Sequence, residues 1–146
     1  MAAPNSPADD LADYLVTQGA GALGSATGWS MAVSFEADTP NTHITLYDIG
    51  GPPPNAHWLL DFPKVQVRVS GAVGGYSAAW TKIQEIKDIL LGLTQTTLGG
   101  TLYVGVSLVG EVNFIAYDEP GRPLLTANFQ IIREPSDTTN RIPMGI

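Results

Sequence analysis

The run Gly50-Gly51-Pro52-Pro53-Pro54 constrains the fold more than any other part of the sequence. Proline lacks the amide proton that a central strand needs, and glycine adopts backbone angles that other residues avoid. No helix or inner strand is therefore expected to cross this run. We expect residues 49–62 to form a long exposed loop between two parts of regular structure.

The part before this loop is predicted to hold one short helix and two strands. Ser6 is a suitable N-cap, Pro7 is tolerated in a first helical turn and Gly19 can end a helix, which predicts a helix over residues 7–18. Residues 29–35 alternate apolar and polar side chains, as a half-buried strand does. A second strand is expected around residues 44–47.

The part after the loop begins with the clearest strand pattern of the chain, in which Val65, Val67 and Val69 alternate with polar residues. Apolar residues then recur every three or four positions over residues 76–91, which predicts a helix that packs on a sheet. Its packed face is expected to carry Tyr76, Ala79, Trp80, Ile83, Ile86 and Leu90.

Three further strand regions are expected, over residues 102–109, 112–116 and 124–132, and the last two are joined by a turn at Asp118, Glu119, Pro120 and Gly121. In the first region, strict alternation places Leu102, Val104, Val106 and Leu108 on one face and Tyr103 off it.

Together these patterns predict one α+β domain over residues 1–134 and an extended C-terminal tail over residues 135–146. The sheet is expected to be mostly antiparallel with about six strands, the helix at 76–91 on one face and the short N-terminal helix beside it. A chain of this length buries roughly 70% of its unfolded surface, so a core forms without metal or disulfide support.

Composition excludes several classes of protein. The absence of cysteine excludes disulfides, thiolate zinc sites, iron–sulfur clusters and a cysteine nucleophile. Seven basic against fourteen acidic residues give a formal charge of −7, which argues against a protein that grips nucleic-acid phosphates. Only 14% of residues are charged, which suits a surface buried in an assembly. Neither a membrane span nor a signal peptide is expected, and we predict a soluble protein.

No motif predicts catalysis, a cofactor or a metal ion. Residues 19–24 match G-x-G-x-x-G, but that motif binds dinucleotides between a strand and a following helix, and here it follows a predicted helix. Residues 71–75 lie between strand and helix but lack the lysine that a phosphate loop needs. His43 and His57 are not spaced as zinc ligands, and no G-x-S-x-G motif is present.

The loop also carries an apolar cluster over residues 57–62 that includes Trp58. An exposed cluster of this kind favours association, so it either packs back on its own domain or docks on a neighbour. A small-ligand or carbohydrate-binding module that uses Trp58 and the loop is an alternative, and such a module would stay monomeric at every concentration.

Four segments resemble the tail terminator and minor capsid proteins of long-tailed bacteriophages. They are ADDLADYLV over residues 8–16, LYDIGGPPP over 46–54, VQVRVSG over 65–71 with the helix that follows, and YDEPGRPLLTANFQI over 117–131. The resemblance spans residues 8–133. One departure is Ser70, which stands where a second basic residue is expected after Arg68.

The resemblance implies a structural virion protein that caps the head-proximal end of the tail tube as a ring, expected to be a homohexamer. The implied partners are other copies of the chain, the tail tube protein and a neck or head-completion protein, with DNA passing through the lumen without specific binding and no membrane involved. The resemblance also implies that the protein is assembled in the host cytoplasm and lies at the head–tail junction of the virion. Another neck connector, such as a head-closure or tail-completion subunit, is the alternative within this class.

Ten residues are candidates for contacts with other subunits or partners. Most belong to the loop, one lies on the predicted central strand, two lie in the late turn and one in the tail. Arg122 is also expected to close its own turn, where an exposed ion pair contributes only about 0–1 kcal/mol. The candidates are Gly50, Gly51, Pro52, Pro53, Trp58, Leu60, Arg68, Asp118, Arg122 and Arg141.

Overall fold

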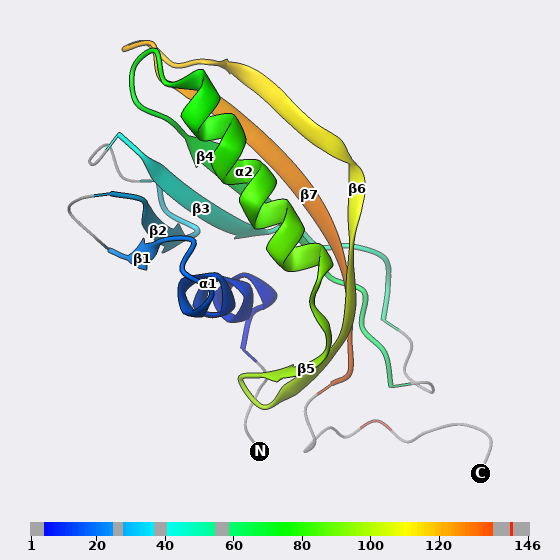
Figure 1. Cartoon of the computed structure of the whole chain (residues 1–146). Coiled ribbons are helices and arrows are strands. Elements are labelled where there is room, and N and C mark those ends of the chain that lie inside the picture. The colour runs from blue at the N-terminus through cyan, green and yellow to red at the C-terminus, as the bar shows by residue number, and fades with distance from the viewer. Residues whose placement is uncertain (1–4, 25–27, 37–40, 55–58, 136–140, 142–146) are drawn as a thin grey trace.

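The computed structural model describes residues 5–24, 28–36, 41–54, 59–135 and 141. These residues form a seven-stranded sheet with two helices against one face (Figure 1). In chain order the elements are α1 (Pro7–Thr17), β1 (Ala22–Leu23), β2 (Ser30–Val33), β3 (His43–Asp48), β4 (Lys64–Ser70), α2 (Tyr76–Leu91), β5 (Thr94–Leu98), β6 (Thr101–Tyr117) and β7 (Pro123–Arg133).

The sheet has the strand order β1-β2-β3-β4-β7-β6-β5 and is mixed. Strand β2 runs parallel to both β1 and β3, and the other neighbours are antiparallel. The α+β class is confirmed, but the prediction of a mostly antiparallel sheet is wrong; the sheet has seven strands where about six were expected. Alternation of apolar residues indicates which face a strand buries and is the same for either direction, so it could not reveal the parallel pairs.

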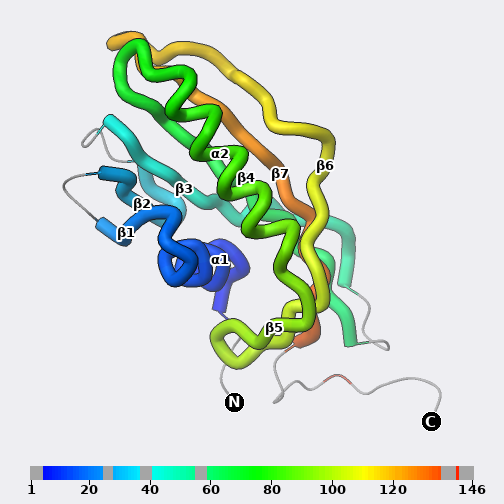
Figure 2. Tube along the Cα trace, viewed as in Figure 1, coloured from blue at the N-terminus to red at the C-terminus, as the bar shows by residue number. Residues whose placement is uncertain are grey.

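Both helices begin where the sequence predicts. The Ser6 hydroxyl accepts a hydrogen bond from the Asp9 amide at 3.1 Å and so caps α1. Helix α2 covers the predicted range of 16 residues and follows a turn at residues 71–75. Figure 2 shows both helices on the same side of the sheet. Their apolar faces meet the alternating valines of β4 and the core-facing residues Leu125, Ala127, Phe129 and Ile131 of β7.

Strand β6 differs most from the expected pattern. Its register against β7 shifts between Tyr103 and Gly105, again between Val109 and Asn113, and again before Ala116. Each bulge inserts residues on one strand and changes which side chains share a face. Tyr103 therefore lies fully buried on the helix side with Val106 and Leu108, and its expected position off that face is wrong.

Strand β5 was not expected, because Thr94, Gln95, Thr96 and Thr97 give it no apolar alternation. It pairs with the start of β6 through a turn at Gly99 and Gly100, both of which have positive φ. Strand β2 is also shorter than expected: it ends at Val33, and Phe35 beyond it is 68% exposed.

A buried polar cluster joins α1 to the start of β6 and the end of β7. The Tyr103 hydroxyl donates to Asp10 Oδ2 at 2.6 Å and accepts from Arg133 Nη1 at 3.0 Å. Arg133 Nη1 also lies 3.7 Å from Asp10 Oδ2 and donates to the Asn5 carbonyl at 2.9 Å. Burial and the bond to Asp10 raise the pKa of Tyr103 above its usual value. The phenol therefore stays protonated and acts as a donor to the carboxylate.

Removing the carboxylate of Asp10 or the hydroxyl of Tyr103 should lower the free energy of unfolding. Asp10→Ala leaves the buried Arg133 without its carboxylate, and we expect a loss of about 3–5 kcal/mol in the free energy of unfolding. Tyr103→Phe removes one buried hydrogen-bond partner and should cost about 1–3 kcal/mol. Urea unfolding followed by circular dichroism measures both changes. Asp13→Ala, at an exposed acid of the same helix, is the control and should change stability by less than about 0.5 kcal/mol. If Asp10→Ala and Asp13→Ala changed the free energy of unfolding by the same amount, the role assigned to Asp10 would be contradicted.

Candidate interaction surfaces

The predicted contact residues do not form one site. The Gly-Pro loop, defined as residues 50–54, lies at the start of β4, where the Lys64 amide donates to the Gly50 carbonyl at 2.7 Å. Asp118 and Arg122 lie at the opposite end of the sheet, in the turn between β6 and β7. Arg68 lies between these ends, on β4.

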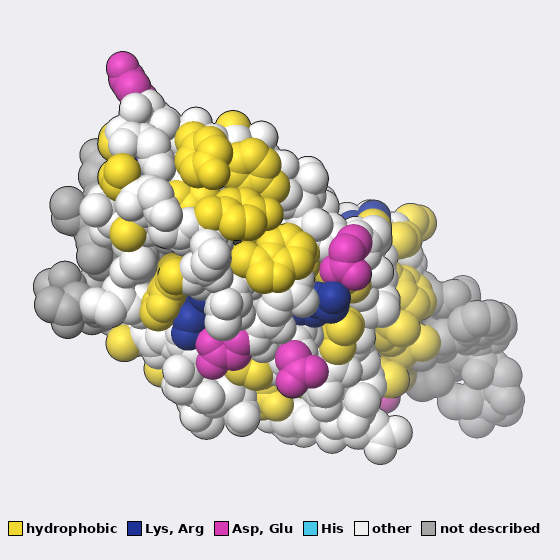
Figure 3. Space-filling model, turned by 45° about the horizontal axis from the view of Figure 1, so that its top comes forward, with side chains coloured by type: hydrophobic (Ala, Val, Ile, Leu, Met, Phe, Trp, Pro, Cys, Tyr) yellow, Lys and Arg dark blue, Asp and Glu magenta, His cyan; other side chains and the backbone are white. Residues whose placement is uncertain are grey.

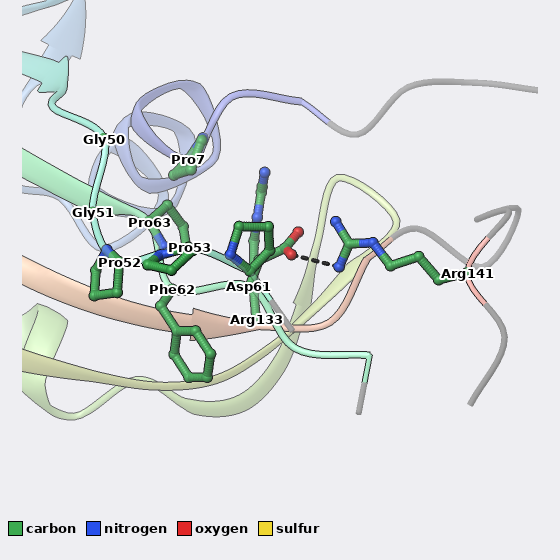
Figure 4. A pocket seen from close by; sticks show the side chains of 11 residues that line it. Pro7, Gly50, Gly51, Pro52, Pro53, Asp61, Phe62, Pro63, Arg133 and Arg141 are labelled. Atoms are coloured by element: carbon green, nitrogen blue, oxygen red, sulfur yellow. Dashed lines mark hydrogen bonds and ion pairs between the residues drawn. The ribbon is translucent and has the colours of Figure 1, made fainter. Parts of the chain in front are cut away.

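A pocket of about 360 Å³ opens beside the Gly-Pro loop (Figure 4). Prolines and Phe62 supply its apolar wall, and Arg133 with the ion pair between Arg141 and Asp61 supplies its polar side. Arg141 Nη1 lies 2.5 Å from Asp61 Oδ1. The structure thus brings five of the predicted contact residues together around this pocket: Gly50, Gly51, Pro52, Pro53 and Arg141.

Glycine is required at position 51. Its φ of +124° is one that other residues rarely adopt, and a Cβ there would lie 2.2 Å from the Phe62 carbonyl oxygen. The loop therefore passes directly over the chain that leads into β4. This close approach fixes the positions of Pro52, Pro53 and Pro54, which follow directly in the chain.

The second half of the predicted loop is not fully exposed. Leu59, Leu60 and Phe62 are half-buried, and the backbones of Asp61 and Arg133 exchange hydrogen bonds of 2.7 and 3.1 Å. This half of the loop is therefore held against the end of β7, whereas residues 49–54 are exposed as expected. His57 and Trp58 lie outside the described residues.

Arg68 forms a pair within its own chain. Its Nη1 atom lies 3.3 Å from Glu36 Oε1, and this ion pair connects β4 to the segment that follows β2. Burial and the nearby Glu36 carboxylate raise the pKa of Tyr47 on the strand between them. The contact of Arg68 that the structure describes is thus one that fixes the fold.

Arg122 closes its own turn, as expected. Its Nε atom lies 2.6 Å from Asp118 Oδ2, and its amide donates to Asp118 Oδ1 at 2.8 Å. Partial burial acts to raise the pKa of Asp118, but the amide and guanidinium of Arg122 outweigh it, and the pKa is lowered. The folded state therefore favours the carboxylate form.

This arrangement predicts a pH dependence of stability. Because the folded-state pKa is lowered, the contribution of Asp118 is present above its unfolded pKa of about 3.9 and is lost as pH falls through the folded value. Arg122→Ala should raise the Asp118 pKa towards its usual value, measured by NMR titration of the carboxyl carbon. Arg141→Ala, which removes a guanidinium at the other end of the sheet, should leave it unchanged. An identical Asp118 titration in wild type and Arg122→Ala would show that the guanidinium does not act on this carboxyl.

A second surface, which the sequence did not indicate, lies over the start of α2 and the end of β6. Tyr76, Trp80, Phe114 and Tyr117 are 36% to 56% exposed, and we call these four residues the aromatic row. Ring centroids lie 6.3 Å apart for Tyr76 and Trp80, 5.5 Å for Tyr76 and Phe114, and 5.2 Å for Phe114 and Tyr117. Figure 3 shows hydrophobic side chains gathered on this face.

The prediction that Tyr76 and Trp80 lie on the packed face of α2 is wrong. Ala79, Ile83, Ile86 and Leu90 form that face, whereas Tyr76 and Trp80 occupy its exposed margin, where Tyr76 contacts Phe114 of β6. Apolar spacing gives the direction of a helix face but not how far the sheet extends below it. The aromatic row therefore remains open to solvent.

The described residues offer neither a metal site nor a membrane span. Among them, no three His, Cys, Asp or Glu side chains gather closely enough to hold a metal ion. No helix in the described part of the chain has both the length and the apolar character needed to cross a bilayer.

Comparison with known proteins identifies one family. A family model described as "Bacteriophage tail terminator protein" matches residues 14–135, a range that includes the Gly-Pro loop and the aromatic row. A chain from a solved structure described as "Virion of native gene transfer agent (GTA) particle" superposes with a TM-score of 0.55 at 13% identity. The alignment covers 74% of this chain and 79% of that one, and at such identity the likeness concerns the fold alone. No curated protein matches the chain.

Proposed function

The chain belongs to the bacteriophage tail terminator family, and we propose that it caps the head-proximal end of the tail tube as a ring of six copies. The match over residues 14–135, which covers the whole sheet, all of α2 and the last turn of α1, is the observation that carries this proposal. Membership of the family makes the protein a structural component of the phage particle, and its proposed role requires no catalytic step, cofactor or metal.

The two exposed surfaces support assembly into a ring. A ring that closes by rotation uses two different surfaces on each subunit, because each copy contacts one neighbour with one surface and the next neighbour with another. The Gly-Pro loop with its pocket and the aromatic row lie at opposite ends of the sheet and have different chemistry. The ring would then present its two rims to the tail tube protein and to a neck or head-completion protein at the head–tail junction.

Charge pairing supports a channel through which DNA passes without being retained. Six of the seven basic residues lie within 4 Å of a carboxylate, in the pairs of Arg68, Lys82, Lys87, Arg122, Arg133 and Arg141. With a formal charge of −7, the subunit offers DNA phosphates little attraction. Assembly in the host cytoplasm, before DNA leaves the head, fits this role.

Imaging combined with mass measurement tests the proposal. Negative-stain images of the purified protein over a concentration series should show closed rings with six-fold symmetry and a central hole, and light scattering should give six times the mass of the chain. Purified tail tubes should recruit the protein to one end only. A protein that stays monomeric and does not bind tail tubes would contradict the proposal and favour the ligand-binding alternative. Binding to heads instead of tubes would indicate another neck connector.

A further inference from the structure

The outer edge of β6 is largely without a neighbouring strand. Strand β5 pairs with β6 only from Thr101 to Gly105, and beyond this point the described residues supply β6 with a partner on the β7 side alone. Backbone amides and carbonyls along such an edge are free to pair with another extended segment. A long open edge is normally covered in the native assembly.

The edge and the aromatic row form one continuous surface. Phe114 lies opposite Leu125 and Tyr117 lies opposite Pro123, and the register shift at Ile115 lets both rings emerge on the helix side although they are three positions apart. Tyr76 of α2 contacts Phe114 across this side. In an extended segment that pairs with the end of β6, every second side chain would therefore contact these aromatic rings.

One segment of the chain has the chemistry that this surface requires. Residues 142–146 read Ile-Pro-Met-Gly-Ile, so Ile142, Met144 and Ile146 would share one face of an extended strand. If the backbone groups of these three residues point towards β6, the backbone of Pro143 points away from it. The missing amide proton of Pro143 then removes no hydrogen bond to β6. Isoleucine packs on aromatic rings, and the thioether of methionine makes favourable contacts with them.

The segment cannot reach the aromatic row of its own chain. Arg141 is held by Asp61, whose backbone pairs with Arg133 at the end of β7, whereas the aromatic row lies beside the start of β7. The strand between these points has 11 residues, which corresponds to about 34 Å at the usual rise. Five extended residues span at most about 18 Å. The occupant must therefore come from another copy.

We propose that residues 142–146 of a second copy lie along the free edge of β6 near Tyr117 and place Ile142, Met144 and Ile146 against the aromatic row. The proposal rests on the ring proposed above and names the surface and the segment through which neighbouring copies meet. The ion pair between Arg141 and Asp61 then sets the direction in which the segment leaves its own subunit.

Disulfide trapping tests this contact, because the chain contains no cysteine of its own. Ile115→Cys and Met144→Cys are combined in the full-length protein; Ile115 is 47% exposed on β6. Light scattering records the mass before mild oxidation, and non-reducing electrophoresis records the covalent species after it. We expect a ladder of covalent oligomers that ends at the mass of the assembly. The control combines Met144→Cys with Leu23→Cys, which is 52% exposed on β1 at the other edge of the sheet, and should give no ladder.

The outcomes separate the two proposals. An assembly of ring mass without a ladder, or with equal ladders in both pairs, would overturn the contact and leave the ring standing. A disulfide formed within one chain would also overturn it. A sample that is monomeric before and after oxidation would overturn the contact, and if it also failed to bind tail tubes, it would overturn the ring as well.

A charge introduced into the segment gives a second, independent test. Met144→Asp should raise the concentration at which half of the protein is assembled by about ten- to a hundredfold, the effect of losing one buried apolar side chain. Thr139→Asp adds the same charge to the tail without removing an apolar residue, and should change that concentration by less than about threefold. Thermal unfolding of the two variants should coincide. Wild-type assembly of Met144→Asp would overturn the proposal.

Discussion

Three buried polar side chains, Asp10, Tyr103 and Arg133, hold the N-terminal helix against the start of β6 and the end of β7. A buried carboxylate and guanidinium are costly unless each finds partners, so this cluster strongly disfavours any arrangement that separates the helix from these strands. Through the backbone of Arg133 it also fixes Asp61, and through Asp61 it positions one wall of the pocket beside the Gly-Pro loop. The chain's first helix and its most irregular loop are thus positioned by the same contacts.

The sequence predicted those parts of the fold that depend on local chemistry. The Ser6 cap, the turn at Asp118 and the range of α2 follow from residues within a few positions of one another. It failed where distant segments decide the outcome. Bulges in β6 moved Tyr103 into the core, and the direction of β2 depends on its neighbours and not on its own residues. Asp10 looked like an ordinary first-turn acid because Tyr103 and Arg133, which bury it in the polar cluster, lie more than 90 positions away.

One of the two candidate surfaces could be predicted from local sequence, and the other could not. The Gly-Pro loop was recognisable because five consecutive residues cannot enter regular structure, and the structure places a pocket beside it. The aromatic row was not recognisable, since Tyr76 and Trp80 have the spacing of core residues and only the limited width of the sheet leaves them exposed. Its other half exists because a single register shift at Ile115 turns Tyr117 to the side of Phe114.

The central position of β7 has a consequence for how the protein is made. This strand is the last of those that the described residues form, yet it pairs with β4 on one side and β6 on the other. Until the ribosome has released it, the rest of the polypeptide has no continuous sheet and no closed core. Folding of this sheet is therefore delayed until β7 has left the ribosome, so a nascent chain that stops short of β7 has no native surface with which to enter an assembly.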